Sequence, residues 1–363
     1  MKILFLTVAL QYSGAQKMMA QVANWLAEAG EEVAITTYFS PEITQKLDER
    51  IKTDCMHVKR GGGAKELLKD YFVFRKRIVN YVLNQKADVV ITFGDLFSTM
   101  ALAELKRKGQ CVIVCERADP GGTDLISRYR RVAFKKASGY VFQTEGAKDC
   151  FCKDIQDRGY VIPNPVIVSH SECLPFEARK KKIVSVGRLE FKQKRQDLLL
   201  EAFEYVHKKH PDYELYCYGD GPDLERARQM AKESDASEKI FLPGAVSPIE
   251  EYIKDASLSV LSSDFEGIPN AVIEAMNMKI PVVSTDCSPG GARLLLGEDE
   301  FGLVVPCGNA EALAEKMIYA IEHKEEMQAK SIGAKESLKR FRPEIISEMW
   351  KKSIYEIKKR GSE

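Results

Sequence analysis

The sequence predicts an α/β protein made of two doubly wound domains, and three observations support this. The chain has 363 residues, more than one hydrophobic core usually organises, with 45% hydrophobic and 29% charged residues. Short apolar or β-branched runs alternate with longer amphipathic stretches, which is typical of parallel sheets covered by helices. The alternation pauses once, between Ile162 and Lys182, and then restarts. We therefore expect two Rossmann-like domains of similar size, facing each other across a cleft.

The first domain is expected to span residues 1–165. Its first apolar run, residues 1–10, has the length of a signal-peptide core but leads into an amphipathic pattern without a small-residue cleavage site, so a buried strand is predicted. No run of about 18 apolar residues occurs, so no membrane-spanning segment is predicted. The predicted strands are residues 2–8, 33–38, 54–58, 88–92, 111–115, 139–142 and 160–162.

The second domain is expected to span residues 166–340, beyond a Pro-rich linker. Its predicted strands are residues 183–187, 213–218, 239–242, 257–261, 281–284 and 302–305. Helical patterns close the chain, and residues 341–363 are predicted to form the last helix. The apolar face available to that helix consists of Phe341, Ile345, Ile346, Met349, Trp350 and Ile354.

Charge is unevenly distributed along the chain, although its net value is only +1. Residues 1–170 hold 25 Lys and Arg against 19 Asp and Glu, whereas the remainder holds 29 against 34. This balance argues against a nucleic-acid partner. A basic N-terminal half could contact an anionic membrane or a polyanionic acceptor, or could simply be an ordinary solvated surface.

Nine cysteines are scattered along the chain without a C-x-x-C pair. Several lie within strand-like apolar runs, such as Cys111 and Cys115. Their spacing does not match a zinc site, so reduced thiols in a cytoplasmic protein are predicted.

Glu266 and Glu274 are separated by seven residues that include a Gly-Ile-Pro-Asn break. Such a break marks the point where a loop becomes a helix. We expect Asn270 to cap this helix with Pro269 just outside it, so that Glu274 lies in the first turn and Glu266 in the loop. A helix N-terminus binds anions and the two carboxylates accept hydrogen bonds from hydroxyl groups, which suits a phosphate-bearing sugar.

Two other turns between a strand and a helix carry glycine. One contains Gly14, where backbone could approach a ligand, although an ordinary tight turn is the alternative. The other runs from Gly187 through Arg188 and Lys192 to Lys194. Ligands of open α/β sheets bind at the carboxyl ends of strands, so these cations could neutralise a diphosphate, whereas a solvated basic loop is the alternative.

Several common motifs are absent from the sequence. It contains no G-x-G-x-x-G after a strand, no G-x-x-x-x-G-K-[ST] and no G-x-S-x-G, which disfavours a dinucleotide dehydrogenase, a P-loop protein and a serine hydrolase. It also lacks D-x-D, the usual carboxylate pair that holds a metal-bound nucleotide sugar. We therefore expect no metal and no cofactor.

Taken together, these residues resemble family 4 retaining glycosyltransferases of the GT-B fold. The resemblance covers nearly the whole chain and is strongest from Ile183 to Pro306. The motifs that carry it are Gly187-Arg188-Leu189, Lys194, Gly219-Asp220-Gly221-Pro222, Glu266-Gly267-Ile268-Pro269-Asn270 with Glu274-Ala275-Met276, Pro289-Gly290-Gly291 and Gly302-Leu303-Val304-Val305-Pro306.

The resemblance implies roles for individual residues. It implies that Glu266 faces the hydroxyls of the donor sugar, that Glu274 holds the ribose, and that Arg188 and Lys194 bind the diphosphate. The backbone of Gly267, Ile268, Pro269 and Asn270 would contact sugar and phosphate, and Gly14 would approach the phosphate from the other domain. The resemblance also implies that the last helix crosses back onto the N-terminal domain.

Two positions depart from the family pattern. The N-terminal turn has Ser13-Gly14 where Gly-Gly is common, and the loop to Lys194 is one residue longer than usual, so Lys192 competes for the phosphate role. The stretch from Glu116 to Pro120 is similar to the E-R-x-D-P of polysaccharide-assembly members. Glu116, Arg117 and Asp119 are therefore candidates for the acceptor side, with structural ion pairs as the alternative.

The predicted function is that of a metal-independent, retaining hexosyltransferase that uses a nucleotide sugar, by resemblance a UDP-sugar. Its acceptor would be a glycan or a lipid-linked saccharide of cell-surface polysaccharide assembly, reached in the cytoplasm or peripherally at the inner membrane face. Arg188, Lys194 and Glu266 are the catalytic candidates. The alternatives are a nucleotide-sugar epimerase or phosphorylase of the same fold, and a non-catalytic sensor of sugar nucleotides.

Overall fold

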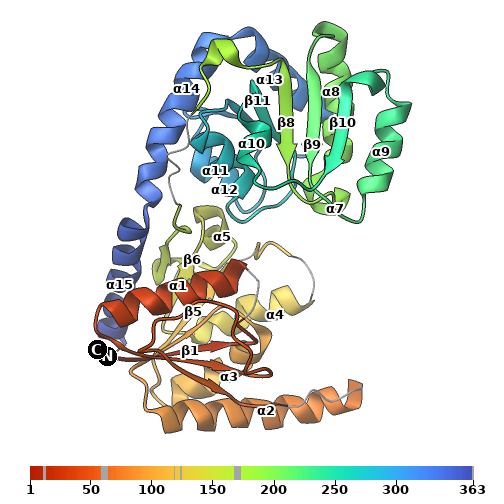
Figure 1. The fold of residues 1–363 in the computed structure, drawn as a ribbon. Coiled ribbons are helices and arrows are strands. Elements are labelled where there is room, and N and C mark those ends of the chain that lie inside the picture. Colours follow the sequence, from red (N-terminus) through yellow and green to blue (C-terminus); the bar gives the residue numbers. More distant parts are fainter. Residues whose placement is uncertain (11–13, 59–63, 118, 123–124, 167–172, 362–363) are drawn as a thin grey trace. The chain divides into compact units, whose positions relative to one another are not determined.

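The computed structural model of the chain describes residues 1–10, 14–58, 64–117, 119–122, 125–166 and 173–361. These residues form two compact units (Figure 1). One unit comprises Met1–Asn164 together with Glu344–Glu363, and the other comprises Pro165–Pro343. Each unit is a parallel sheet with helices on both faces, so the predicted pair of doubly wound domains is confirmed.

The N-terminal unit is built on a seven-stranded parallel sheet in the order β3-β2-β1-β4-β5-β6-β7. Its strands are β1 (Lys2–Thr7), β2 (Glu32–Thr37), β3 (Lys52–Cys55), β4 (Val89–Thr92), β5 (Val112–Glu116), β6 (Gly139–Phe142) and β7 (Gly159–Val161). Its helices are α1 (Gly14–Glu28), α2 (Ala64–Gln85), α3 (Leu96–Arg107), α4 (Leu125–Ala133), the 3-10 turn η1 (Phe134–Lys136), α5 (Glu145–Asp149), α6 (Lys153–Asp157) and α15 (Pro343–Arg360).

The C-terminal unit is built on a six-stranded parallel sheet in the order β10-β9-β8-β11-β12-β13. Its strands are β8 (Lys182–Val186), β9 (Glu214–Tyr218), β10 (Ile240–Gly244), β11 (Leu258–Leu261), β12 (Val282–Thr285) and β13 (Leu303–Val305). Its helices are α7 (Phe191–Lys194), α8 (Gln196–Lys209), α9 (Leu224–Glu233), α10 (Glu250–Ile253), α11 (Asn270–Asn277), α12 (Gly291–Leu296), α13 (Ala310–Glu322) and α14 (Lys324–Ser337), with the 3-10 turns η2 (Phe176–Ala178), η3 (Ser237–Lys239) and η4 (Leu338–Phe341).

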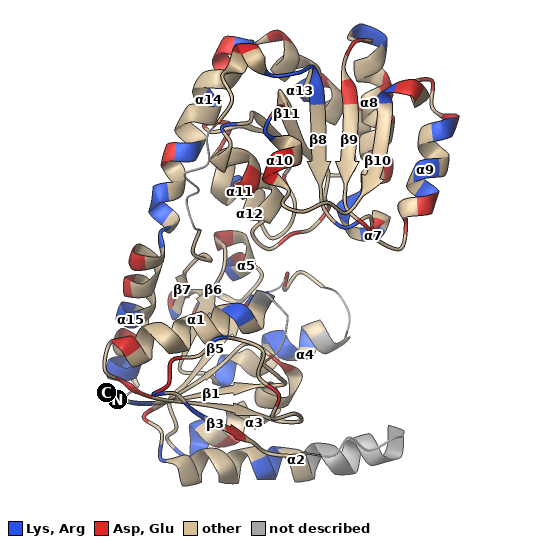
Figure 2. Ribbon diagram, viewed as in Figure 1, with Lys and Arg blue, Asp and Glu red and all other residues tan. Residues whose placement is uncertain are grey.

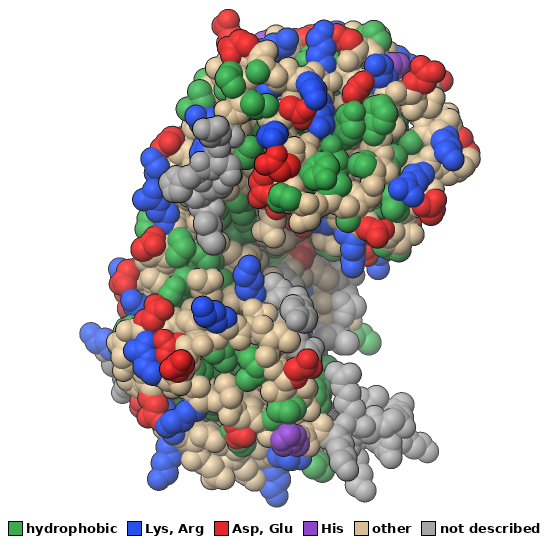
Figure 3. Space-filling model, viewed as in Figure 1, with side chains coloured by type: hydrophobic (Ala, Val, Ile, Leu, Met, Phe, Trp, Pro, Cys, Tyr) green, Lys and Arg blue, Asp and Glu red, His purple; other side chains and the backbone are tan. Residues whose placement is uncertain are grey.

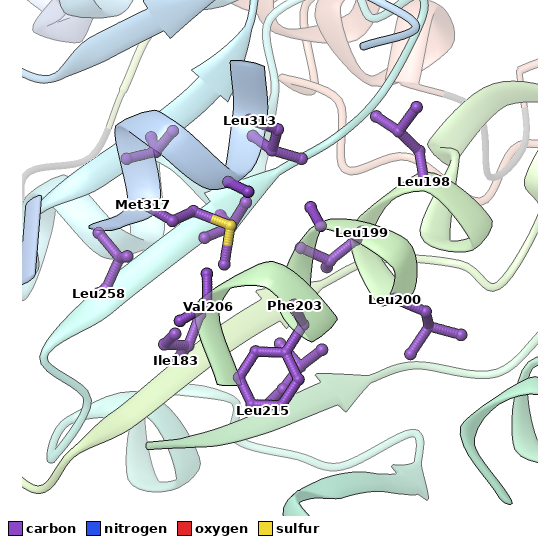
Figure 4. Close-up of a cluster of buried hydrophobic side chains, with 14 of the residues drawn as sticks. Ile183, Leu198, Leu199, Leu200, Phe203, Val206, Leu215, Leu258, Leu313 and Met317 are labelled. Carbon is purple, nitrogen blue, oxygen red and sulfur yellow. The ribbon is translucent and has the colours of Figure 1, made fainter. Parts of the chain in front are cut away.

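Most strands are apolar on both faces because helices cover most of both sides of each sheet, whereas the edge strand β3 is largely exposed. In β8, Ile183 packs with α8 and α13, whereas its neighbour Val184 packs with α11 and α12 on the other face. Figure 4 shows the first of these cores, where Phe203 of α8 and Met317 of α13 lie over the sheet. Lys, Arg, Asp and Glu residues lie mainly on helices and loops, as the ribbon colours in Figure 2 show. This division explains why apolar runs located the other predicted strands to within about two residues, whereas β3, predicted at residues 54–58, ends three residues earlier, at Cys55.

One sheet face in the C-terminal unit is partly open. Figure 3 shows apolar side chains gathered over β9 and β10 on the viewed face. Tyr216 and Phe241 stack there with ring centroids 4.6 Å apart, and Phe241 and Tyr252 are exposed. The sheet is therefore less completely covered at this edge.

The first strand and the cysteines lie largely as expected. Residues Ile3 to Thr7 of β1 are buried. All nine cysteines are free thiols, but Cys152 and Cys307 are exposed rather than buried. Among the described residues, no helix is long and apolar enough to cross a membrane.

The last helix, α15, contributes to the core of the N-terminal unit. Trp350 is 1% exposed and stacks against Phe93 with ring centroids 6.3 Å apart. The hydroxyl of Tyr160 donates a 2.6 Å hydrogen bond to Glu356. The predicted apolar face is partly wrong, because Ile345 and Met349 are exposed. Ile357, which the prediction left out, is buried with Ile346, Trp350 and Ile354.

Replacing Trp350 with Ala should destabilise the N-terminal unit by about 3–5 kcal/mol, because the change leaves a large cavity beside Phe93. Urea unfolding followed by circular dichroism and limited proteolysis would measure the loss. Met349→Ala, on the exposed side of the same helix, is the matched control and should cost less than about 1 kcal/mol. Equal effects of the two substitutions would contradict the described packing of α15.

Candidate active site

The candidate site is centred on Glu266, in the loop between β11 and α11. Its carboxylate is largely buried and accepts a 2.9 Å hydrogen bond from Ser263 Oγ. The Lys194 ammonium forms an ion pair with the same oxygen, Oε1. Burial of a carboxylate is costly unless it is paired and hydrogen-bonded, and these two contacts provide both. The structure therefore brings the predicted residues Lys194 and Glu266 into direct contact.

Lys194 is held in place by the short helix α7. The Gln193 side chain donates a 3.1 Å hydrogen bond to the carbonyl of Phe265, and Asp264 N–H donates to the carbonyl of Gln193 at 2.9 Å. Ser262 Oγ donates to the Lys194 carbonyl at 2.8 Å. The turn after β8 is thus fixed to the loop that carries Glu266, and the ammonium is aimed at the carboxylate.

The other cations of this turn lie differently. Lys192 is exposed, so the structure groups Lys194 rather than Lys192 with Glu266. The Arg188 side chain is 63% exposed and forms an ion pair with Glu190. An exposed guanidinium of this kind can turn toward a ligand at little cost, because surface ion pairs contribute at most about 1 kcal/mol.

A second loop, between β12 and α12, completes the site from the other side. Glu266 N–H donates a 2.7 Å hydrogen bond to the carbonyl of Ser288, and Ser288 N–H donates to the carbonyl of Asp264 at 3.1 Å. A Cβ atom at Gly291 would lie only 1.6 Å from the carbonyl oxygen of Gly267. Only glycine allows the two backbones to approach this closely, which accounts for the Gly at this position of the motif.

The start of α11 differs from the prediction. Pro269 is the N-cap residue and Asn270 is the first helical residue, without a side-chain cap, so the predicted capping role of Asn270 is wrong. Glu274 consequently lies in the second turn of the helix rather than the first. Pro is suited to this place because the first amides of a helix have no partner within it.

Glu274 is half-buried in this second turn. Burial, together with the nearby Glu250 carboxylate, raises the pKa of Glu274 from 4.5 to about 7. A carboxyl group whose pKa is raised in this way is common at ligand sites, although structural groups also show it.

The predicted residues of the N-terminal unit lie at the start of α1 and around the end of β5. Gly14 is the first residue of α1, whereas Ser13 lies outside the described residues. Glu116 ends β5, is 3% exposed and forms a 2.6 Å ion pair with Arg130. Asp119 accepts a 2.8 Å hydrogen bond from Gly121 N–H in the following turn. The contacts of Glu116 and Asp119 are those of the structural alternative.

Arg117 is half-buried, and its contacts also match the structural alternative. It donates to the carbonyl of Ile162 at 3.0 Å and to the side chain of Asn164, and its guanidinium lies 6.0 Å from the centre of the Trp350 ring. Burial lowers the pKa of Arg117 to about 10. These contacts tie the end of β5 to the segment after β7.

Two residues of the site were missed by reading the sequence. Ser263 contacts Glu266 directly and could have been suspected from its place just before the motif. Arg195 has a left-handed backbone, with φ of 51°, and contacts Asp264 at 3.1 Å and Asp197 at 3.2 Å. No sequence signal marks such a conformation in an arginine. Within the described ranges, no group of three or more His, Cys, Asp or Glu side chains is placed to hold a metal ion.

Comparison with known proteins adds to this geometry. Residues 170–337 match the family model described as glycosyl transferases group 1. A glycosyltransferase of Haemophilus influenzae is 27% identical over 346 residues, which cover 93% of this chain and 95% of that protein. A second relative is an alpha-1,4-N-acetyl-D-galactosaminyltransferase of Campylobacter jejuni, whose name includes a saccharide on PP-undecaprenol. It is 24% identical over 367 residues, which cover 99% of this chain and 99% of that protein.

Two solved structures show the same fold over their full length. The apo form of the lipopolysaccharide outer core galactosyltransferase WaaB has a TM-score of 0.80 and 19% identity, with 98% of this chain and 99% of that chain covered. Anabaena HepE, solved in complex with UDP and glucose, has a TM-score of 0.73 and 15% identity, with 98% and 99% covered. Residues 170–337 thus form a group 1 glycosyl transferase domain, and the chain is a glycosyltransferase with the GT-B fold.

Proposed function

We propose that this glycosyltransferase retains the configuration of a hexose or N-acetylhexosamine that it transfers from a UDP-sugar to a glycan or lipid-linked acceptor in cell-surface polysaccharide assembly. The observation that carries the proposal is the convergence of Lys194 and Ser263 on the buried Glu266 carboxylate. The Glu266 carboxylate, which can accept hydrogen bonds from sugar hydroxyls, lies beside the Lys194 ammonium, which can bind a phosphate. A sugar phosphate requires both kinds of group.

The donor would be held by charge and by hydrogen bonds. Lys194 and Arg188 would bind the diphosphate, Glu266 would accept hydrogen bonds from the sugar hydroxyls, and Glu274 from the ribose. When the bond between the anomeric carbon and phosphate oxygen breaks, negative charge builds on the departing diphosphate. Fixed cations at that position stabilise the transition state more than the ground state.

The acceptor proton would be taken by the leaving phosphate on the same face of the sugar. The new glycosidic bond forms there as the old bond breaks, which retains the configuration. Lys194 and Arg188 supply the charge that a metal ion supplies in other transferases, and the proposed reaction therefore uses no metal. The UDP and glucose in the HepE complex and the saccharide in the name of the Campylobacter relative support the proposed substrates.

We also propose that α4 contacts an anionic membrane surface where a lipid-linked acceptor resides. Leu125 and Val132 are 81% and 65% exposed and share one face of the helix with Tyr129. Arg128, Lys135 and Lys136 are exposed beside them. An amphipathic helix with apolar residues on one face and Lys or Arg around it suits the interface of an anionic bilayer.

Lys194→Ala should lower the turnover of a UDP-sugar donor by about 10²-fold or more, because the cation at the leaving group is lost. The assay would measure UDP release over a panel of UDP-sugars with added acceptor glycans. Lys192→Ala, two residues away and exposed, is the matched control and should stay within about twofold. Equal activity of Lys194→Ala and the parent chain, with the fold verified by circular dichroism, would refute the site assignment.

Glu274 should make donor binding depend on pH. With a pKa of about 7, it is roughly one-tenth ionised at pH 6 and nine-tenths at pH 8. Since the ionised carboxylate is the better acceptor for ribose hydroxyls, the affinity for UDP-glucose should rise by up to about tenfold over this range. Isothermal titration calorimetry would measure it. The Glu274→Gln variant should show a flat profile, and a rise that persists in that variant would assign the effect to another group.

Vesicle flotation would test the membrane contact of α4. The chain should float with vesicles that contain phosphatidylglycerol, less so at high salt, and should not float with neutral phosphatidylcholine vesicles. Leu125→Ser combined with Val132→Ser should reduce the floated fraction at least about fivefold. Ile332→Ser, at an exposed apolar position of α14, is the control. Equal flotation of the double variant and the control would refute the role of α4.

A further inference from the structure

A cavity of about 360 Å³ lies at the amino edge of the C-terminal sheet. Its walls come from the residues before β8, β11 and β12 and from the junction of α13 and α14. The loops that carry Lys194 and Glu266 follow the opposite, carboxyl ends of β8 and β11, and the arrowheads in Figure 1 mark the carboxyl ends of the strands. This cavity, which we call the amino-edge pocket, is therefore separate from the candidate active site.

The inner wall of the amino-edge pocket is apolar. Leu258, Ile321 and Met327 line it, and all three are buried in the core. Tyr213, the residue before β9, adds an aromatic ring. An apolar wall of this kind favours a ligand with a flat or compact apolar body.

The rim of the pocket is basic. The lining residues include four cations, Arg179, Lys180, Lys181 and Lys324, and one acidic residue, Glu177. Lys180 and Lys181 form ion pairs with Asp255 and Asp212. Lys324, in contrast, forms no ion pair with any residue in the described ranges. The rim therefore carries a cation that is available to an incoming anion.

Arg179 adds a second cation without a carboxylate partner. Its guanidinium donates to the carbonyls of Lys279 and Met278 at 2.9 and 3.0 Å and lies 4.2 Å from the centre of the Phe176 ring. Its Nε is buried and has no hydrogen-bond partner among the described residues. Neutral carbonyls fix this group without cancelling its charge, so its positive field persists at the rim.

We propose that the amino-edge pocket is a second ligand site, which binds a small organic anion with its charged group at Lys324 and Arg179 and its apolar body against Leu258 and Met327. The volume lies within the range of about 300–1,000 Å³ that is usual for small-molecule sites. A bare inorganic anion would leave the apolar wall unfilled. The proposal does not depend on the reaction proposed for the active site.

The fluorescent anion 1-anilinonaphthalene-8-sulfonate is a suitable probe, because it joins an aromatic body to one sulfonate and becomes fluorescent in apolar surroundings. We expect saturable binding to the full chain with one site per molecule. UDP should not displace the probe, since the residues proposed to bind the donor follow the opposite, carboxyl ends of the strands. Displacement by UDP, or the absence of saturable binding, would overturn the proposal.

Variants locate the binding. Lys324→Glu should lower the affinity for the probe at least about fivefold. This variant should fold normally because Lys324 is exposed at the start of α14, where an acidic residue is favourable. Gln328→Trp, at a half-buried position that lines the pocket, should fill the space and weaken binding more than about tenfold. Lys232→Glu, exposed on α9, is the matched charge-reversal control. Unchanged affinity in both pocket variants would refute the site.

Discussion

The buried carboxylate of Glu266 is the constraint on which the C-terminal unit's loops depend. It is largely buried in the loop that follows β11, where an unpaired negative charge would be strongly destabilising. Its stability requires both Lys194, from the turn after β8, and Ser263, from its own loop. Backbone hydrogen bonds to Ser288 extend the arrangement to the loop after β12. Three loops that are far apart in the sequence are therefore joined at Glu266, through its carboxylate and through the backbone beside it.

This arrangement is suited to catalysis because the charges are in place before any ligand arrives. A donor diphosphate would meet a cation already aimed into the site rather than one recruited from solvent, which lowers the reorganisation that accompanies the reaction. The strands behind the loops are short and buried on both faces, so the loops have rigid supports. Arg188 differs from Lys194 in being exposed, and the site thus combines one fixed cation with one adjustable cation.

The sequence allowed the prediction of most strands and of the grouping of Lys194 with Glu266, but not of the contacts that fix these two residues. Apolar runs located most strands because helices cover most of both sheet faces, and the spacing of Glu266, Glu274 and Lys194 indicated one site. The start of α11 was misjudged, since Pro269 and Asn270 are both good helix-start residues and only the backbone decides between them. Arg117 illustrates another limit: a charged motif residue looks the same in sequence whether it faces a ligand or the ring of Trp350. The left-handed backbone of Arg195 depends on contacts with Asp197 and Asp264, which no local pattern encodes.

The return of α15 to the N-terminal unit has a consequence for synthesis of the chain. The N-terminal core needs Ile346, Trp350 and Ile354, yet the whole segment Pro165–Pro343 is made before them. At about 5–20 residues per second, translation of that segment takes roughly 10 to 40 s. During this time the surface that will receive Trp350 is exposed on the nascent chain, whereas the C-terminal unit has all of its own core residues as soon as Phe341 is made. The unit synthesised second is therefore the first that can complete its core, and the N-terminal unit is the one that a chaperone would have to protect.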